Sequence, residues 1–380
     1  MEWSRLAGNA LLLAVMAGAA ACSCSPRPES AALASGADSL TVTPVGRFEF
    51  ESPEVTDPRL LPEELSGIAW TGGDDYLAIG DAHACVHRLA VRVDPKSGRI
   101  QSAKFEEAIL LRDDRGEVIP DAKTGEDREG IAYDADSAEV WIANERTGAD
   151  AKRSSLARHR LSDGRITRLV GTGEGTELPD LAGQRPNRGF ESLTRTPDGT
   201  GLWTATEGPL RRDGPEPTDS TGAVVRLQRL DVAMAPVAQY AYAIDPFTAR
   251  ITSPFFLAGT ELSGVSELIA LPDGRLLALE RAFAGDSTGA AGLRCRLYVV
   301  DTAGATDVSR GELATGLSGR TYAPARKTLL WELDAGLTNS NFEGMTLGPA
   351  LSGRDRLLLL IADNNEGGSE ALYSLRIHIP

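Results

Sequence analysis

Short apolar runs, each bounded by glycines and acids, recur along most of the chain. A unit near the C-terminus opens with residues 341–345 (Asn-Phe-Glu-Gly-Met), passes a turn-rich break at 351–355, and continues as an apolar run that ends at Asp363. Apolar runs of this length between turn residues are typical of β-strands. Helical periodicity is hard to find elsewhere in the sequence. The pattern therefore predicts an all-β protein.

The same opening recurs four times upstream. An acid or serine starts each apolar run, and successive openings lie 62 to 76 residues apart. The aligned positions are Ser66, Glu129, Glu191, Glu267 and Glu343. A second apolar run follows each opening and ends in an acid. These second acids are Asp81, Glu145, Glu207, Glu280 and Asp363. Repeats of short antiparallel strands at this period indicate a single β-propeller.

The number of blades is less closely defined than the architecture. Five copies of the opening predict five blades, but the two longer intervals leave room for more strands, so six blades stay open. The last copy is followed only by residues 371–379, which leaves its unit one strand short. We expect the N-terminal run from Leu40 to Phe50 to supply that strand and close the ring, because closure removes exposed sheet edges.

Strand direction predicts where the acids lie. The inner strand of a propeller blade runs from one face to the other and the second strand returns, so both sets of acids should meet at one axial mouth. Like charges at close range raise one another's pKa, so cations or arginines must balance them. Several arginines adjoin the acids in the sequence, namely Arg128, Arg146, Arg188 and Arg281.

Oxygen ligands dominate these positions. With neither a zinc-like cysteine pair nor more than four histidines, such a set favours Ca²⁺ over Zn²⁺. The predicted calcium ligands are Glu129, Glu191, Glu267, Glu343, Asp363 and Asn364. The alternative is that these acids cap strand ends and pair with the arginines to hold neighbouring blades together.

Candidate catalytic residues come from the same mouth. They are Glu343, Asp363, Glu129, Glu191, Arg281 and His83. His83 follows a strand-end acid and is a candidate general base. His87 lies four residues further on, roughly 13 Å away on an extended chain, too far to share a metal ion with His83. The sequence contains no Gly-x-Ser-x-Gly nucleophile elbow, which weakens a serine hydrolase interpretation.

The N-terminus predicts export. Residues 1–21 read as a signal peptide because their apolar core, Leu11 to Ala21, is too short to span a bilayer. The small residues before Cys22 resemble a bacterial lipobox, so Cys22 is expected to carry a lipid, with simple secretion as the alternative. Residues 22–39 are rich in Ser, Ala and Pro and predict a flexible tether.

The net charge and the cysteine content limit the binding partners and the disulfides that can be expected. The net charge of -15 repels nucleic acid and anionic lipid headgroups, so neither is expected, and the membrane is reached only through the lipid anchor. Beyond the cleavage region only Cys85 and Cys295 remain. We expect them to be buried thiols, although a disulfide is permissible in an exported protein.

Five separated segments share a family likeness. They are residues 189–193, 206–210 with 213–216, 279–283, 304–308, and 341–345 with 363–365. Together they resemble the phytase-like family, described as the "esterase-like activity of phytase" domain, from about Ser66 to the C-terminus. The resemblance implies a propeller-like domain, placed at residues 40–380, and a phosphoester or carboxylester hydrolase activity.

Two functions of different classes follow. The first is an exported hydrolase, periplasmic or on the outer membrane and otherwise secreted, that cleaves a small-molecule ester, phosphorylated or not, at a metal-assisted axial site. We expect such a protein to be a monomer. The second is a non-catalytic propeller of the cell envelope that binds a ligand or a protein.

Overall fold

The computed structural model describes residues 39–50, 53–120, 126–146, 153–171, 178, 183–218, 220–246, 261–285, 291–332, 341–363 and 370–380. The fold below is that of the unit Asp38–Pro380. The predicted signal peptide, Cys22 and all of the predicted tether except Ser39 lie outside the described residues. In the described part, no helix has the length and apolar character needed to cross a membrane.

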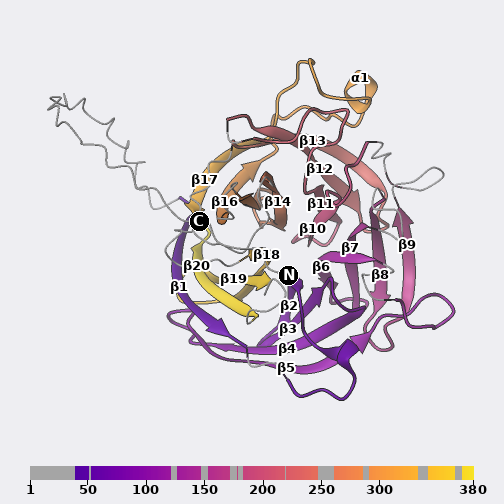
Figure 1. Cartoon of the computed structure of the whole chain (residues 1–380). Coiled ribbons are helices and arrows are strands. Elements are labelled where there is room, and N and C mark those ends of the chain that lie inside the picture. Colours follow the sequence, from indigo (N-terminus) through magenta and orange to yellow (C-terminus); the bar gives the residue numbers. More distant parts are fainter. Residues whose placement is uncertain are drawn as a thin grey trace, which may run out of the picture. The chain divides into compact units, whose positions relative to one another are not determined.

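Five four-stranded antiparallel sheets are arranged around a common axis (Figure 1). Four of them are formed by consecutive strands. The first contains β2 (Leu65–Gly72), β3 (Asp75–Gly80), β4 (Cys85–Val93) and β5 (Ile100–Leu110). The second contains β6 (Asp127–Asp134), β7 (Glu139–Arg146), β8 (Ser155–Arg160) and β9 (Ile166–Gly171). The third contains β10 (Phe190–Arg195), β11 (Gly201–Thr206), β12 (Ala223–Asp231) and β13 (Pro236–Ile244). The fourth contains β14 (Glu261–Ala270), β15 (Leu276–Gly285), β16 (Ala291–Asp301) and β17 (Arg326–Glu332).

The fifth sheet joins the two ends of the propeller. It contains β18 (Asn341–Ala350), β19 (Asp355–Asp363), β20 (Ala371–His378) and the N-terminal β1 (Thr41–Glu49). Strand β1 pairs antiparallel with β20, from Thr41 opposite His378 to Glu49 opposite Ala371. The predicted closure by the N-terminal strand is therefore confirmed.

The protein is a five-bladed β-propeller. The sheets number five, and the described parts of the longer intervals form no sixth sheet. Between β16 and β17 the chain instead makes an excursion that contains the short helix α1 (Gly311–Ala314). Buried Arg226 holds this excursion, donating to the carbonyl oxygens of Val308 at 3.2 Å and Leu313 at 2.8 Å. A one-turn 3₁₀ helix, η1 (Pro58–Leu60), precedes the first blade.

The inner strands β2, β6, β10, β14 and β18 contact one another in turn around the axis. Glycine is required where they approach most closely. A Cβ atom on Gly130 would lie 2.5 Å from the Leu193 nitrogen, and one on Gly344 would lie 2.6 Å from the Ser66 oxygen. The Glu-Gly pairs of the sequence motif thus combine a polar side chain with a close backbone contact.

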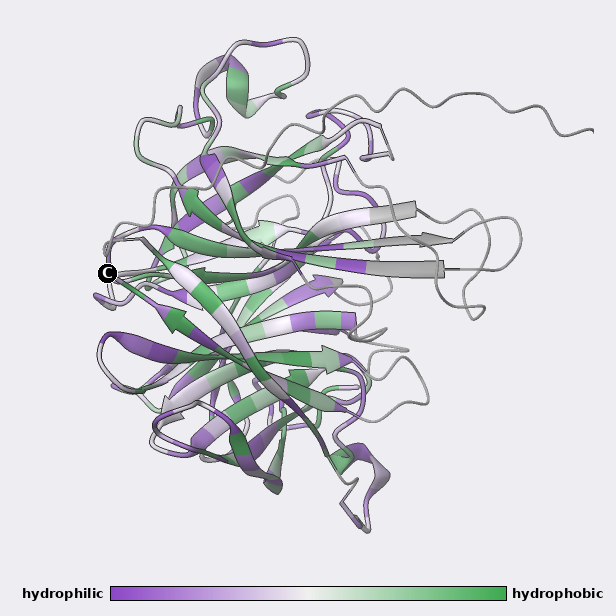
Figure 2. Ribbon diagram, turned by 90° about the vertical axis from the view of Figure 1, so that its left-hand side faces the viewer, coloured by the Kyte–Doolittle hydropathy of each residue, from purple (hydrophilic) through white to green (hydrophobic). Residues whose placement is uncertain are grey.

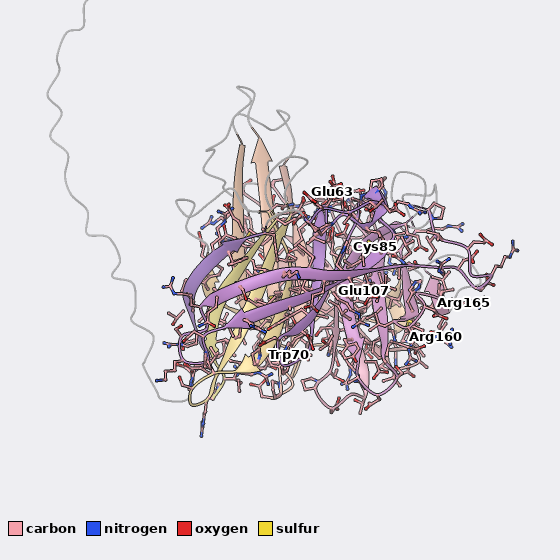
Figure 3. All side chains as sticks on the ribbon, turned by 90° about the horizontal axis from the view of Figure 1, so that it is seen from below. Glu63, Trp70, Cys85, Glu107, Arg160 and Arg165 are labelled. Atoms are coloured by element: carbon pink, nitrogen blue, oxygen red, sulfur yellow. The ribbon has the colours of Figure 1, made fainter. Side chains whose placement is uncertain are left out.

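The core lies between neighbouring blades. Hydrophobic residues are concentrated in the strands (Figure 2), and Leu357 to Ile361 of β19 are all fully buried. Each inner strand crosses the propeller from one face to the other. Seen from the side, Glu63, just before β2, and Trp70, near its end, lie toward opposite faces (Figure 3).

Candidate metal centre

Each inner strand begins at the same mouth and contains a register shift at an equivalent point. A bulge of this kind re-aims a side chain. It lies within the first three residues of β2, β6, β10 and β18, and at the sixth residue of β14. The residues at the shifted position are Ser66, Glu129, Glu191, Ser266 and Glu343. Three blades therefore supply an acid and two supply a serine.

The second strand of each blade brings another side chain to this mouth. The residue before each bulge pairs with a residue of the second strand, and the residue that follows this partner in the sequence lies at the mouth. These residues are Asp81, Glu145, Glu207, Arg281 and Asp363. The first, second, third and fifth blades each supply an acid here, and the fourth blade supplies Arg281.

The fourth blade corrects the sequence alignment. Glu267 lies one residue beyond the bulge, and Glu280 lies one residue before the mouth position. Because side chains alternate along a strand, a shift of one residue sends each of them elsewhere. Glu280 accepts a hydrogen bond from Tyr242 at 2.6 Å and forms an ion pair with Lys327 at 2.5 Å, so it does not join the acids of the mouth.

Glu267 is part of the axial packing. Its Oε1 accepts from the backbone nitrogens of Leu193 at 3.1 Å and Leu268 at 2.8 Å. Burial raises the pKa of Glu267, against the effect of these bonds and of a third from the Met345 N–H. Its bonding therefore links three blades, and it belongs to neither of the carboxylate groups described next.

Two groups of carboxylates converge at the mouth. Asp81, Asp127 and Glu129 form one group, and Glu129, Glu145 and Glu191 form the other. Within each group, one carboxylate oxygen from every residue lies within 4.8 Å of the others. Glu129 belongs to both. We call these five residues the carboxylate half of the mouth.

Burial and mutual repulsion shift the acidity of this half. Burial and then the nearby charges of Glu191 and Glu343 raise the pKa of Glu129. Burial and then Glu207 raise the pKa of Glu145 to about 8. The pKa of Asp81 rises to about 9, first through burial and then through its hydrogen bond with the Glu64 carboxyl. Each of these groups therefore favours a proton or a bound cation.

Arginines balance the other side of the mouth. Arg281 forms an ion pair with Glu343, a second with Glu207 at 3.0 Å, and donates to Asn341 Oδ1 at 2.9 Å. Arg188 Nη1 lies 2.5 Å from Glu207 Oε2. Burial opposes ionisation, yet Arg188 and Arg281 hold the pKa of Glu207 below its ordinary value. We call Glu207, Glu343, Arg188 and Arg281 the arginine-paired half.

The other two predicted arginines are Arg128 and Arg146. Arg128 donates to the backbone oxygen of Glu126 at 3.1 Å and lies 3.4 Å from its carboxylate. The side chain of Arg146 lies outside the described residues. Among the described ion pairs, none joins an arginine to Asp81, Glu129, Glu145 or Glu191.

The carboxylate half fits a hard cation. Glu145 is 1% exposed, and its Oε1 accepts from the Gly189 nitrogen at 2.9 Å. Its Oε2 is buried without a hydrogen-bond partner, as is Asp81 Oδ1. A buried carboxylate oxygen without a partner is costly unless it is protonated or ligates a metal. Oxygen-only donors of this kind suit Ca²⁺.

The remaining predicted residues lie around these groups. Asn341 Nδ2 donates to Glu343 at 2.6 Å and to Asp363 at 3.2 Å, so these two acids meet, although they lie outside both carboxylate groups. His83 Nε2 lies 3.4 Å from a Glu63 carboxylate oxygen, also outside both groups. Asn364 lies outside the described residues.

His87 and the two cysteines lie in the interior of the protein. His87 is buried, which lowers its pKa to about 4, and its Nε2 lies 3.2 Å from the Cys85 sulfur. It is therefore an interior residue. Cys85 and Cys295 are both buried thiols, as expected.

Sequence reasoning missed three acids at this mouth. Asp127 lies two residues before the motif residue Glu129, at a position that is not part of the repeated motif. Glu64 precedes β2 in a left-handed conformation (φ 50°), where a non-glycine residue is uncommon. Burial and then Asp363 raise the pKa of Glu370 to about 9. Glu370 lies directly before β20, so its place at the mouth could be predicted only once β20 was known to belong to the blade that closes the ring.

The fold and the mouth define a five-bladed propeller with a carboxylate-rich axial site. The family model "Phytase-like: Esterase-like activity of phytase" matches residues 63–366. The chain therefore belongs to the phytase-like family, which confirms the resemblance found in its motifs. No curated protein matches the chain.

Solved propellers share only a distant likeness. The PQQ-bound aldose sugar dehydrogenase of Streptomyces coelicolor is 14% identical, with 89% of this chain and 98% of that chain covered and a TM-score of 0.37. The periplasmic gluconolactonase PpgL of Pseudomonas aeruginosa is 13% identical, with 80% of each chain covered and a TM-score of 0.30. A streptogramin B lyase is 10% identical, with 88% and 98% covered and a TM-score of 0.31. At these values no activity carries over to this chain.

Proposed function

We propose that this protein is a calcium-dependent ester hydrolase whose active site is the acidic mouth. The observation that carries the proposal is the pair of carboxylate groups joined by Glu129, with the unpartnered Glu145 Oε2 in one of them. Family membership supports the reaction class, since the family is described by an esterase-like activity. The substrate is a small-molecule phosphoester or carboxylester.

Asp81, Asp127, Glu129, Glu145 and Glu191 would hold the calcium. When bound, Ca²⁺ supplies Lewis acidity toward an ester oxygen and lowers the pKa of a water molecule. The protein contributes fixed positions: the bulges aim Glu129 and Glu191, and the Gly189 N–H holds Glu145.

Arg281 is proposed to bind an anionic oxygen of the substrate. It lies between the Glu207 and Glu343 carboxylates, is 17% exposed, and is held by Asn341. Glu343 and Asp363 fix this arrangement through Asn341, which donates to both. His83 stays a candidate base, and an unchanged turnover in His83→Ala would remove it from the mechanism.

The test is a panel of phosphate and carboxylate esters, assayed with Ca²⁺ and again after chelation. We expect turnover that chelation abolishes and added Ca²⁺ restores, and that Glu129→Gln lacks. Glu332→Gln is a matched control because Glu332 pairs with Arg294 and Arg296 rather than with the mouth residues. Full activity in the chelated enzyme would overturn the calcium-dependent mechanism.

The ion pairs of Arg281 favour a second function. They join acids of the third and fifth blades to the fourth, as expected for a non-catalytic propeller that binds a ligand or an envelope protein. Silence across the ester panel, from a folded protein that still binds Ca²⁺, would support that function instead.

Export remains part of the proposal. The predicted signal peptide ends before Cys22, which would carry the lipid. In a bacterial host, the wild-type chain should fractionate with membranes and Cys22→Ala should not. A wild-type chain found only in soluble fractions would contradict lipidation.

A further inference from the structure

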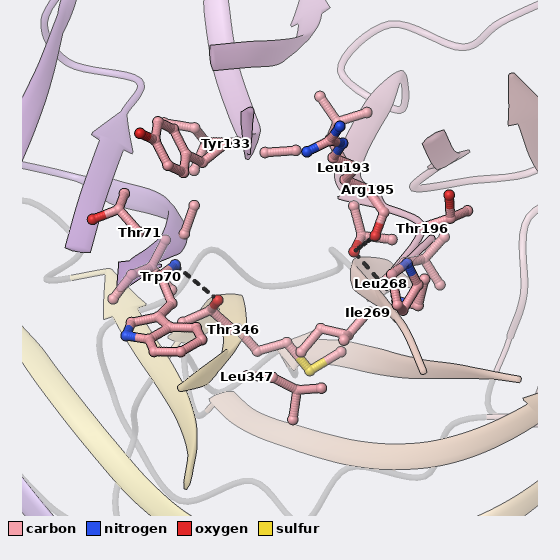
Figure 4. Close-up of a pocket in the computed structure, with 18 of the residues that line it drawn as sticks. Trp70, Thr71, Tyr133, Leu193, Arg195, Thr196, Leu268, Ile269, Thr346 and Leu347 are labelled. Atoms are coloured by element: carbon pink, nitrogen blue, oxygen red, sulfur yellow. Dashed lines mark hydrogen bonds between the residues drawn. The ribbon is translucent and has the colours of Figure 1, made fainter. Parts of the chain in front are cut away.

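A pocket of about 410 Å³ lies at the opposite end of the axis from the acids. It is lined by the later residues of the five inner strands and by the turns that follow them, so it is open at the face where Trp70 lies (Figures 3 and 4). Its volume is within the range of small-molecule sites. We call it the distal pocket.

The floor of the distal pocket is an apolar ring. Each blade contributes one side chain, namely Ile68, Ile131, Leu193, Leu268 and Met345. Glu267 lies on the mouth side of this ring, bonded to the nitrogens of Leu193 and Leu268. The distal pocket is therefore separated from the carboxylate half by apolar side chains and a buried carboxylate.

The walls are aromatic and hydroxyl-bearing. Trp70 and Tyr133 face the pocket from adjacent blades, and Figure 4 shows their rings beside an open centre. Hydroxyls of the neighbouring blades satisfy the strand nitrogens here: Thr346 accepts from Trp70 N at 3.1 Å, and Thr194 from Ala270 N at 3.2 Å. With these groups already paired, the walls present mainly apolar surface.

The charge of the pocket is positive. Its two charged lining residues are Arg195 and Arg356, and no acid lines it. Arg195 is neutralised by Asp134 at 3.1 Å and Asp136 at 3.3 Å. Arg356 lies over the Trp70 ring at 5.6 Å and donates from Nε and Nη2 to the Gly348 oxygen.

Arg356 forms no ion pair with a described residue, and the turns at this face (residues 72–75, 135–138, 196–201, 271–275 and 350–355) all lie within the described part of the chain. These turns carry Asp74, Asp75, Asp136, Asp198, Asp273 and Asp355, but none of these carboxylates forms an ion pair with Arg356, and Asp355 pairs with Arg376 and His378 instead.

We propose that the distal pocket binds a small aromatic carboxylate. Its ring would lie on the apolar floor between Trp70 and Tyr133, and its carboxylate would take hydrogen bonds from the free Nη donors of Arg356. A single cation over an apolar floor favours one negative charge rather than a polyanion. In a protein of net charge -15, this pocket is a place where an anion is attracted locally.

The test compares naphthalene-2-carboxylate with naphthalene-2-carboxamide by calorimetry, with chelator present. We expect the wild-type protein to bind the carboxylate about tenfold more tightly, since a hydrogen bond to a charged group is worth more than a neutral one. Arg356→Gln should remove this preference. Arg376→Gln, an equivalent change on the adjacent strand β20 at a residue that pairs with Asp355, should keep it.

Three results would overturn the proposal: equal binding of the two probes by the wild type, no carboxylate binding at millimolar concentration, or a preference that persists in folded Arg356→Gln. Melting curves show that the variants are folded. Glu129→Gln should bind the carboxylate like the wild type. Failure of the ester assay therefore leaves this site untouched, and failure here leaves the mouth untouched.

Discussion

The two halves of the acidic mouth use the same residue type and balance it in different ways. In the arginine-paired half, Arg281 lies between Glu207 and Glu343, and Arg188 adds a second partner to Glu207. In the carboxylate half, five acids share a small space, and Glu145 Oε2 has no partner. Arginines of the protein therefore balance the carboxylates of the arginine-paired half, whereas the carboxylate half needs protons or a bound cation.

Removing Arg281 should have the largest effect on stability. Arg281→Gln would leave two buried carboxylates, Glu207 and Glu343, with less compensation, and breaking a buried ion pair costs about 3–5 kcal/mol. Urea denaturation should show this loss in the free energy of unfolding. Arg160→Gln, whose pair with Asp163 is exposed to solvent, should cost much less. Equal effects of the two changes would show that the arginine-paired half is not held by Arg281.

Removing the shared ligand should have the next largest effect. Glu129 belongs to both carboxylate groups. Loss of an outer-shell partner already weakens metal affinity by 10- to 100-fold, so Glu129→Gln should weaken calcium binding by about 100-fold or more. Glu207→Gln, in the arginine-paired half, should lose less than about tenfold by the same standard. A wild-type affinity in Glu129→Gln would place the calcium elsewhere.

Raising the pH should destabilise the calcium-free protein. The folded-state pKa is about 8 for Glu145 and about 9 for Asp81, both above the ordinary carboxyl range. The folded state therefore holds more protons than the unfolded state, and this contribution is lost as pH rises from roughly 4 through these values. Thermal melts with chelator should show a falling Tm, by about 2 °C or more.

Calcium should reverse this trend, because it binds the ionised carboxylates. The rise in Tm on adding Ca²⁺ should be larger near pH 8 than near pH 5. A rise that does not depend on pH would separate calcium binding from Glu145 and Asp81.

The smallest effect is expected at Glu267. Its carboxylate is bound by backbone nitrogens of Leu193 and Leu268, outside both carboxylate groups. Glu267→Gln should therefore leave calcium affinity within about threefold of the wild type. A loss as large as that of Glu129→Gln would restore the sequence alignment, in which the two glutamates are equivalent.

The fold could be predicted well from the sequence because the repeated motif corresponds to a structural contact between inner strands. An acid-glycine pair marks a close approach of inner strands at Gly130 and Gly344, and a related strand opening recurs once in each blade. Ring closure by the N-terminal strand followed from the strand missing at the end. Six blades had stayed open, but the chain forms five. Part of the long interval between Glu267 and Glu343 is the excursion held by Arg226 and not an additional sheet.

The site was predicted less completely, for a local reason. In the fourth blade the glutamates lie one residue from the mouth positions, which Ser266 and Arg281 occupy. A pattern of acids favours the wrong register there, since only strand pairing shows which side chains face the axis. Asp127 and Glu370 were missed because they belong to no repeated motif: Asp127 opens the same strand as Glu129, and Glu370 lies directly before β20, the strand that pairs with β1.

A calorimetric titration of chelator-treated wild-type protein with Ca²⁺ tests the central claim most directly. We expect saturable binding with release of protons, because carboxyl groups with raised pKa must ionise to bind the metal. The proton release should appear as a binding heat that changes with the ionisation enthalpy of the buffer. Absence of calcium binding by the folded protein would contradict it.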